Sequence, residues 1–296
     1  MKVGANGAAP HKRQIDARTS LSLILRRISS PLSEDDLALW VEEVQSTLSR
    51  HLQFALRVLH RTLRRLPQAR IQWPTYEELQ ESERLFSASL RRLRGVALVF
   101  DGRDHKIERS ADDKLQALYY SGRKKIHCVK SLVVFTATGL IAFAAVNWPG
   151  SHHDAFVYRE SGLHDRIESL PDGIYAACDS GFRHGTNHIL REFTEGEIDA
   201  VIRNHSQEFA TTFQHRAKRL RKEIGKVQVQ AEWGMALITK PWRRFLLSLP
   251  ANSHQYRKLL FETAMHLSNL RTRCMGINQI FKVNQSRFSN RNAIFR

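Results

Sequence analysis

Three acidic residues in different parts of the chain have the surroundings expected of metal ligands. Asp101 follows the apolar run 97–100, and Asp179 follows the run 175–178. Such runs are typical of strands buried on both faces, so both carboxylates are expected at strand ends. Glu232 lies in a helical pattern, on the flank of an apolar stripe. Because Mg²⁺ and Mn²⁺ prefer oxygen ligands, and two ions about 4 Å apart can stabilise the attacking and leaving oxygens of a phosphodiester, the three residues predict a two-metal site.

Each of these residues also has an ordinary structural interpretation. A strand-end aspartate often caps a turn or a helix, and Glu232 could be a surface acid. Cys178, which precedes Asp179, is interpreted as a core residue rather than a nucleophile. An isolated acid beside an apolar stripe is unusual in a segment as basic as the last third of the chain, which favours the metal interpretation.

The charge of the chain points to a polyanionic partner. Lys and Arg number 46 against 29 Asp and Glu, which gives a net charge of +17. From Arg203 to Arg296 there are 18 basic residues and four acids, a net of 18 − 4 = +14. Neutralised phosphates release counterions and so favour binding. We therefore expect the late third to face the phosphates of double-stranded DNA, with contacts from Arg219, Lys222, Arg243 and Arg244. Further phosphate contacts are expected from Arg123, Lys124 and Lys125, in the loop before the expected hairpin.

Other classes of protein fit the sequence poorly. It has no apolar stretch of about 20 residues and no signal-peptide pattern, so we expect neither a membrane-spanning nor a secreted protein. The three cysteines are widely spaced and form no zinc or disulfide pattern.

The periodicity divides the chain into five segments. They are a disordered basic tail, a helical segment, a linker with a helix, the catalytic domain and a second basic tail, at residues 1–17, 18–66, 67–95, 96–283 and 284–296.

Residues 34–50 in the helical segment resemble a helix-turn-helix. In that interpretation Ser46, Thr47 and Arg50 face the major groove. The turn carries Glu42 and Glu43 in place of the usual glycine, and acids are unfavourable near DNA. A small helical domain that only packs against the rest is the alternative.

The catalytic segment predicts strands that alternate with helices. The expected strands are 96–100, 128–137, 140–147, 174–178 and 198–202. A loop is expected over 103–125, a helix capped by Ser151 and Asp154 up to residue 167, and a basic helix over 206–224 that Gly225 ends. This order indicates an α/β fold with a ribonuclease-H-like mixed sheet flanked by helices.

Five segments, taken in order, resemble the successive signatures of PIF/Harbinger transposases. They are 100–102, 119–127, 148–154, 178–182 and 232–245, and the resemblance covers residues from about 20 to 283. It implies a DDE endonuclease that cuts transposon ends and joins them to target DNA. Asp101, Asp179 and Glu232 are then the catalytic metal ligands, separated by 179 − 101 = 78 and 232 − 179 = 53 positions.

The resemblance also implies partners. Such a nuclease is expected in the nucleus, as a homo-oligomer, with a separately encoded Myb-like DNA-binding protein. Family members usually have more sequence before the helix at Leu21, so part of an end-binding domain is expected to be missing. Two alternatives share the fold: a domesticated, catalytically silent DNA-binding or adaptor protein, and a ribonuclease for RNA–DNA hybrids.

Overall fold

The computed structural model describes residues 15–90, 93–179, 181–182, 187–276 and 278–294. Of the expected N-terminal tail, residues 1–14 lie outside this part of the chain. Asp16 is already the N-cap of the first helix, where its side chain accepts hydrogen bonds from the backbone N–H groups of Arg18 and Thr19.

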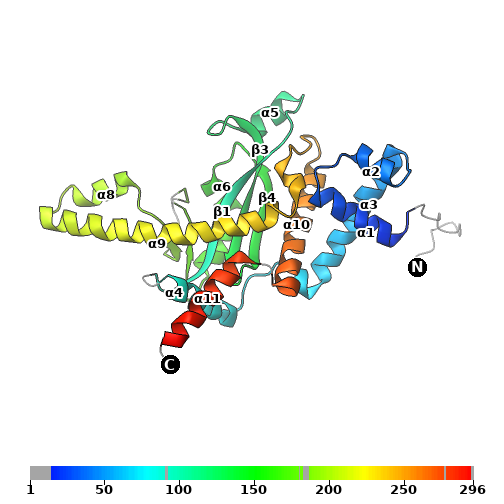
Figure 1. The fold of residues 1–296 in the computed structure, drawn as a ribbon. Coiled ribbons are helices and arrows are strands. Elements are labelled where there is room, and N and C mark those ends of the chain that lie inside the picture. Colours follow the sequence, from blue (N-terminus) through cyan, green and yellow to red (C-terminus); the bar gives the residue numbers. More distant parts are fainter. Residues whose placement is uncertain (1–14, 91–92, 180, 183–186, 277, 295–296) are drawn as a thin grey trace.

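A mixed sheet forms the centre of the molecule (Figure 1). Strand β1 (Val96–Lys106) pairs antiparallel with β3 (Ile126–Thr136), which pairs antiparallel with β4 (Ile141–Pro149). On its other side β1 pairs parallel with β5 (Tyr175–Ala177), which pairs parallel with β6 (Ile189–Leu190). The order β4-β3-β1-β5-β6, with the first three strands antiparallel, confirms the predicted ribonuclease-H-like sheet. The short strand β2 (Tyr120–Ser121) pairs with the start of β3.

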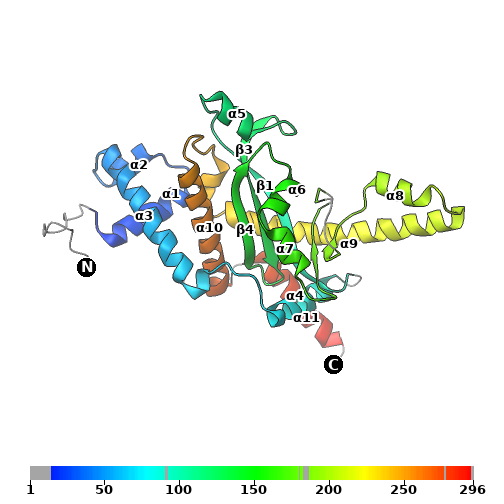
Figure 2. The same ribbon diagram turned by 180° about the vertical axis from the view of Figure 1, so that it is seen from behind.

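Helices cover both faces of the sheet (Figures 1 and 2). On one face α6 (Asp154–Glu160) and α7 (Leu163–Glu168) pack on side chains such as Phe100 and Val134. On the other face α9 (Gln207–Thr239), α10 (His254–Met275) and α11 (Gln279–Ile294) pack on side chains such as Val99 and Phe135. The strand alternation therefore assigns Val99 and Asp101 to the α9 face.

The N-terminal helices continue the core of the catalytic domain. They are α1 (Ala17–Ser29), α2 (Glu34–Trp40) and α3 (Gln45–Arg65), followed by the short helix η1 (Pro67–Ala69) and by α4 (Tyr76–Ser89). Leu52 and Leu56 of α3 lie in one buried cluster with Leu260 and Phe261 of α10. The expected linker is also held in place, since His266 Nδ1 lies 2.8 Å from the carbonyl oxygen of Ala69.

Helix α8 (Glu195–Ile202) and the outer half of α9 (residues 207–223) project away from the sheet in both views (Figures 1 and 2). We call this pair the arm. Helix α8 has no buried residue, whereas the inner half of α9 buries Ile224, Val227, Ala231 and Met235. The outer half of α9 buries only Ala217 and Glu223, and its Leu220 packs against the central core, so most of the arm is exposed.

Several predicted elements were wrong. The loop expected over 103–125 holds the end of β1 and helix α5 (Asp113–Tyr119). The helix expected up to 167 is two helices, because Gly162 takes a left-handed φ of 77°, and His153 rather than Ser151 is its N-cap. The strand expected at 198–202 is α8.

Two helices continue where we expected them to end. Gly225 does not break α9, and α11 runs through the position of the expected C-terminal tail, with Asn284 fully buried. Asn284 donates hydrogen bonds to the carbonyl oxygen of Ala137 and to Gln230, so polar contacts anchor this helix. The remaining short helix, η2 (Arg243–Leu246), packs Phe245 into the core.

Candidate active site at the ends of β1 and β5

Asp101 lies in β1, and Asp179 lies two residues beyond the end of β5, the parallel neighbour of β1. Val99 of β1 is in register with Ala177 of β5, and both are buried on the α9 face. Because side chains alternate with a period of two, the same alternation continued past Ala177 would bring Asp179 to the face of Asp101. Cys178, between Ala177 and Asp179, faces the opposite core, and burial raises the pKa of its thiol well above the usual value. A thiol so disfavoured as thiolate is no nucleophile, as expected.

The carboxyl group of Asp101 lies in a strongly acidic environment. Its pKa rises from 3.8 to about 6, first because the group is buried, and further because of the nearby charges of Asp179, Asp154 and Glu232. The hydrogen bond of 2.7 Å that its Oδ1 accepts from the N–H of Gly102 works in the opposite direction. Asp179 and Glu232 therefore each lie within electrostatic reach of Asp101, which is the most buried of the three.

Helix α9 brings Glu232 to this face of the sheet. Ala231, Met235 and Ile238 recur at helical spacing and are buried against the sheet. The close approach depends on Gly234, since a Cβ there would lie only 2.7 Å from the ring of Phe135. Glu232 itself is exposed on the flank of this stripe, as the sequence predicted.

The three carboxylates suit divalent cations in their chemistry, but they do not converge on one point. Three carboxylates, one of them with a pKa raised to about 6 first by burial and further by its acidic neighbours, offer the oxygen ligands that Mg²⁺ or Mn²⁺ favours. Among the residues that the structure describes, however, no three His, Cys, Asp or Glu side chains lie close enough together to hold one metal ion. The three residues therefore fit divalent ions in the chemistry of their side chains, and their positions as they stand do not form a closed metal site.

A network of charges centred on the buried pair Asp104 and Lys130 borders Asp101, and this pair was not predicted from the sequence. Lys130 Nζ lies 3.3 Å from Asp104 Oδ1 and 2.9 Å from Asp154 Oδ1. Lys124 Nζ lies 2.7 Å from Asp104 Oδ2, and Arg123 reaches Asp154 at 4.0 Å. Burial opposes ionisation of Asp104, but its two lysine partners outweigh burial and lower its pKa. The signal that could have revealed the network is the alternation of β1, which puts Asp104 on the face opposite Asp101, directly across from Lys130.

A family model described as DDE superfamily endonuclease matches residues 100–269. The match covers 170 of the 296 residues and includes all three predicted acids. The chain belongs to the DDE superfamily endonucleases. No curated protein matches it.

Crystal structures of the Mos1 transposase match this chain at low identity and low TM-score. A crystal structure of the Mos1 mariner paired-end complex with Mn is 13% identical, covers 80% of this chain and 82% of its own, and has a TM-score of 0.22. A Mos1 paired-end complex with the left transposon end gives the same identity and TM-score, with coverages of 80% and 83%. A pre-cleavage Mos1 transpososome is 12% identical, with coverages of 79% and 82% and a TM-score of 0.21.

The predicted DNA contacts of this DDE endonuclease fall in three places. Arg123 and Lys124 lie beside the acidic site, where Asp154 and Asp104 hold them, and Lys125 takes a φ of 56° in the same turn. Other predicted contacts lie on the outer half of α9 and on η2: Arg219, Lys222, Arg243 and Arg244. Arg244 is partly buried, and this burial lowers its pKa, so its guanidinium is less available than the exposed side chain of Arg243.

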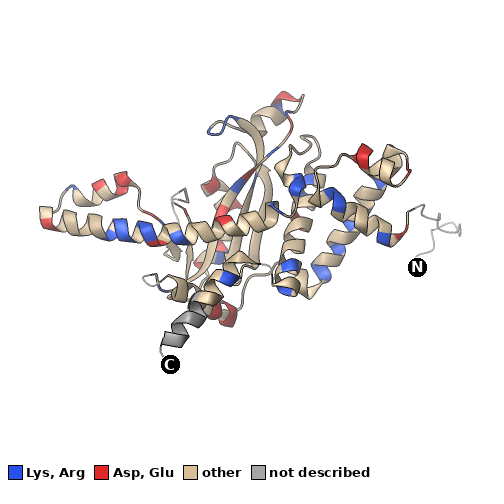
Figure 3. Ribbon diagram, in the orientation of Figure 1, with Lys and Arg blue, Asp and Glu red and all other residues tan. Residues whose placement is uncertain are grey.

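Helices α2 and α3 are joined by a short turn, and the helix-turn-helix interpretation of this pair stays a prediction. Glu42 takes a φ of 53° in the turn, the left-handed conformation usually given to glycine. Ser46, Thr47 and Arg50 lie in the first turns of α3, and Arg50 donates hydrogen bonds back to Ser46 and Thr47. The acids of α2 and of the turn lie close by along the chain (Figure 3), so the charge opposes a phosphate contact that the backbone geometry allows.

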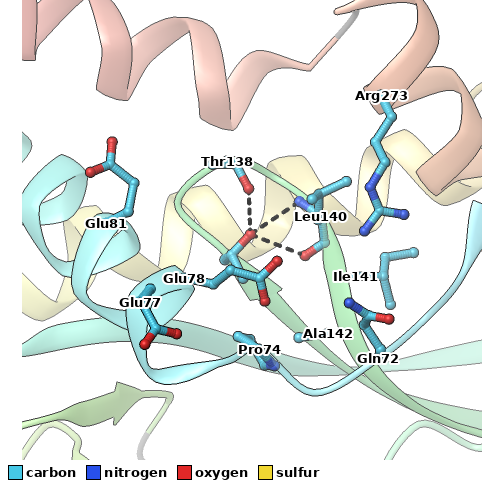
Figure 4. A pocket seen from close by; sticks show the side chains of 11 residues that line it. Gln72, Pro74, Glu77, Glu78, Glu81, Thr138, Leu140, Ile141, Ala142 and Arg273 are labelled. Carbon is cyan, nitrogen blue, oxygen red and sulfur yellow. Dashed lines mark hydrogen bonds between the residues drawn. The ribbon is translucent and has the colours of Figure 1, made fainter. Parts of the chain in front are cut away.

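A cavity of about 310 Å³ lies at the end of the sheet where β1 begins (Figure 4). Asp101, Asp179 and Glu232 are not among its lining residues. The β3–β4 turn, the start of α4 and Arg273 of α10 line it. Its acidic residues, Glu77, Glu78 and Glu81, are distinct from the candidate ligands. This cavity is therefore separate from the candidate active site.

Proposed function

We propose that this DDE endonuclease cleaves DNA phosphodiesters at transposon ends and transfers the resulting strand to target DNA. Asp101, Asp179 and Glu232 would hold two Mg²⁺ or Mn²⁺ ions. The observation that carries the proposal is the raised pKa of Asp101, because Asp179 and Glu232, the two other acids selected from the sequence, contribute to it. A site that accumulates negative charge is prepared for cations.

The residues of the chain have separate tasks in this proposal. When bound, the ions supply Lewis acidity to the attacking and leaving oxygens. Asp101 must release its proton to become a ligand, and Asp179 and Glu232 provide further carboxylate oxygens. Arg123 and Lys124, which the neighbouring acids hold in place, can neutralise a phosphate of the bound DNA.

The decisive experiment is nicking of supercoiled plasmid in Mg²⁺ or Mn²⁺. The wild-type protein should nick, and Asp101→Asn and Glu232→Gln should each lose at least about a hundredfold in rate. Glu208→Gln is the matched control, because it removes another exposed acid of α9 and should nick normally.

Two other outcomes identify the alternatives. DNA binding that weakens with salt but shows no nicking in any divalent ion would indicate a silent adaptor protein, an interpretation favoured by the absence of three closely grouped ligands in the described residues. Cleavage of an RNA–DNA hybrid with duplex DNA left intact would indicate a ribonuclease.

The proposal includes a cellular setting that follows from the resemblance of the sequence. We propose that the protein acts in the nucleus, as a homo-oligomer and together with a Myb-like DNA-binding protein. Imaging of a fluorescent fusion, with and without such a protein, tests the location, and a cytoplasmic signal in both cases would contradict it.

A further inference from the structure

The arm exposes an apolar groove between its two helices. Phe193 and Ile198 on one side and Ala217 of α9 on the other line a cavity of about 370 Å³. Phe193 and Phe209 are each about 40% exposed, at 39% and 40%, and both contact the ring of Phe213. Two helices with so little buried surface are only marginally stable alone, so the apolar groove is expected to be covered.

The two walls of the groove carry opposite charges. Glu195 and Asp199 line the α8 wall, and Lys218 and Arg221 line the α9 wall. Of these, Arg221 lies 3.2 Å from Glu192, outside the groove. Figure 3 shows acids on α8 and bases along the outer half of α9. A two-fold axis through the arm would set the acidic wall of one copy against the basic wall of the other, so the groove is complementary to itself.

We propose that two copies of this chain pair through their arms, with α8 of one copy against α9 of the other. DNA, the other candidate occupant, would bind the basic wall but would be repelled by Glu195 and Asp199. A second copy would pair charges on both the acidic α8 wall and the basic α9 wall, and would cover Phe193.

The pairing has a consequence for the catalytic site, which rests on the proposed function. Glu232 lies on the same continuous helix as the arm. A dimer formed through the arms would therefore hold, from its outer end, the helix that carries Glu232.

The dimensions of the arm set the expected affinity. The outer half of α9 has 17 residues, from 207 to 223, which at 1.5 Å each gives about 25 Å. Helix α8 has eight residues, or about 12 Å, and with each helix about 10 Å wide the face measures about 370 Å² per copy. This lies below the usual size of a stable interface, so we expect a weak, concentration-dependent dimer.

Sedimentation velocity of the full chain, without DNA or metal, tests the pairing over about 0.5–100 µM protein. The variants are Asp199→Lys and Lys218→Glu, which reverse one exposed charge on each wall. Each variant alone should bind itself at least about tenfold more weakly, because like charges then face each other. An equimolar mixture should recover dimers close to wild-type affinity, since the reversed walls complement each other. Asp172→Lys and Lys114→Glu, exposed positions outside the arm, are the matched controls.

Three results would overturn the proposal: a wild-type protein that stays monomeric, dimers that neither reversal weakens, or a mixture that stays monomeric. Circular dichroism of each variant shows whether it is folded. Because the measurement needs no cleavage, the pairing can fail while nicking succeeds, and the reverse also holds.

Discussion

Replacement of Asp101 by asparagine should stabilise the metal-free protein at neutral pH. The pKa of Asp101 is about 6 in the folded protein against 3.8 for an ordinary aspartate. Each pH unit between the two pKa values costs the folded state about 1.4 kcal/mol, so ionisation costs about 3 kcal/mol in total above pH 6. Asparagine carries no charge, has the same shape, and its oxygen can still accept the hydrogen bond from Gly102.

The sign of this effect depends on pH. Because the pKa is higher in the folded than in the unfolded state, the free energy of unfolding of the wild type falls as pH rises from about 4 to 6 and then levels off. Asp101→Asn lacks this loss. Urea denaturation in EDTA should therefore show equal stability near pH 4 and an advantage of up to about 3 kcal/mol for the variant at pH 7.5. Added Mn²⁺ should stabilise the wild type and leave the variant unchanged.

Asp104, three residues along the same strand, is the matched control. Lys124 and Lys130 lower its pKa despite burial, so its carboxylate adds stability at neutral pH that is lost as pH falls below the usual value. Asp104→Asn should thus be destabilised at pH 7.5. A variant Asp101→Asn that is no more stable than wild type at pH 7.5, or equally shifted at both pH values, would refute the acidic environment on which the site is built.

Further predictions concern packing and DNA binding. Gly234→Ala should lower stability by about 1–3 kcal/mol in thermal denaturation, because its Cβ would meet the buried ring of Phe135, whereas Gly196→Ala, with nothing within 4 Å, should be neutral or stabilising. Arg257→Met should cost about 3 kcal/mol or more in urea denaturation, since the buried guanidinium hydrogen-bonds Asn147 and other groups. Affinity for duplex DNA should fall steeply between 50 and 200 mM salt in fluorescence anisotropy, by about tenfold or more, and a salt-independent affinity would contradict a phosphate-facing surface.

The parts of the fold that the sequence predicted are those with a single dominant signal. The buried runs before Asp101 and Asp179 can only be central strands, and their ends had to meet at one edge of a mixed sheet. The stripe around Glu232 likewise determined which face of α9 is buried. These local patterns were enough to predict the strands and the helix that carry or precede the three acids, whereas a shared metal site stays a prediction.

Other elements were missed because two signals competed or because the stabilising contacts are polar. The segment 198–202 has an apolar pattern that favours a strand, but Thr194 and Glu197 form a capping box that begins a helix. Helix α11 has little apolar periodicity, since its anchor is the hydrogen bonding of Asn284. The roles of Asp104 and Asp154 depend on Lys130, whose position across the sheet requires the strand register.

The shared cluster of α3 and α10 bears on how this enzyme can be divided. Leu52 and Leu56 are interior residues of the same core as Leu260 and Phe261. A truncated chain that starts at β1 would expose the apolar outer side of α10, and the detached first helices would expose the apolar side of α3 that covers it. The two halves should therefore stay soluble only when produced together, and the N-terminal helices cannot be exchanged between relatives as an independent module.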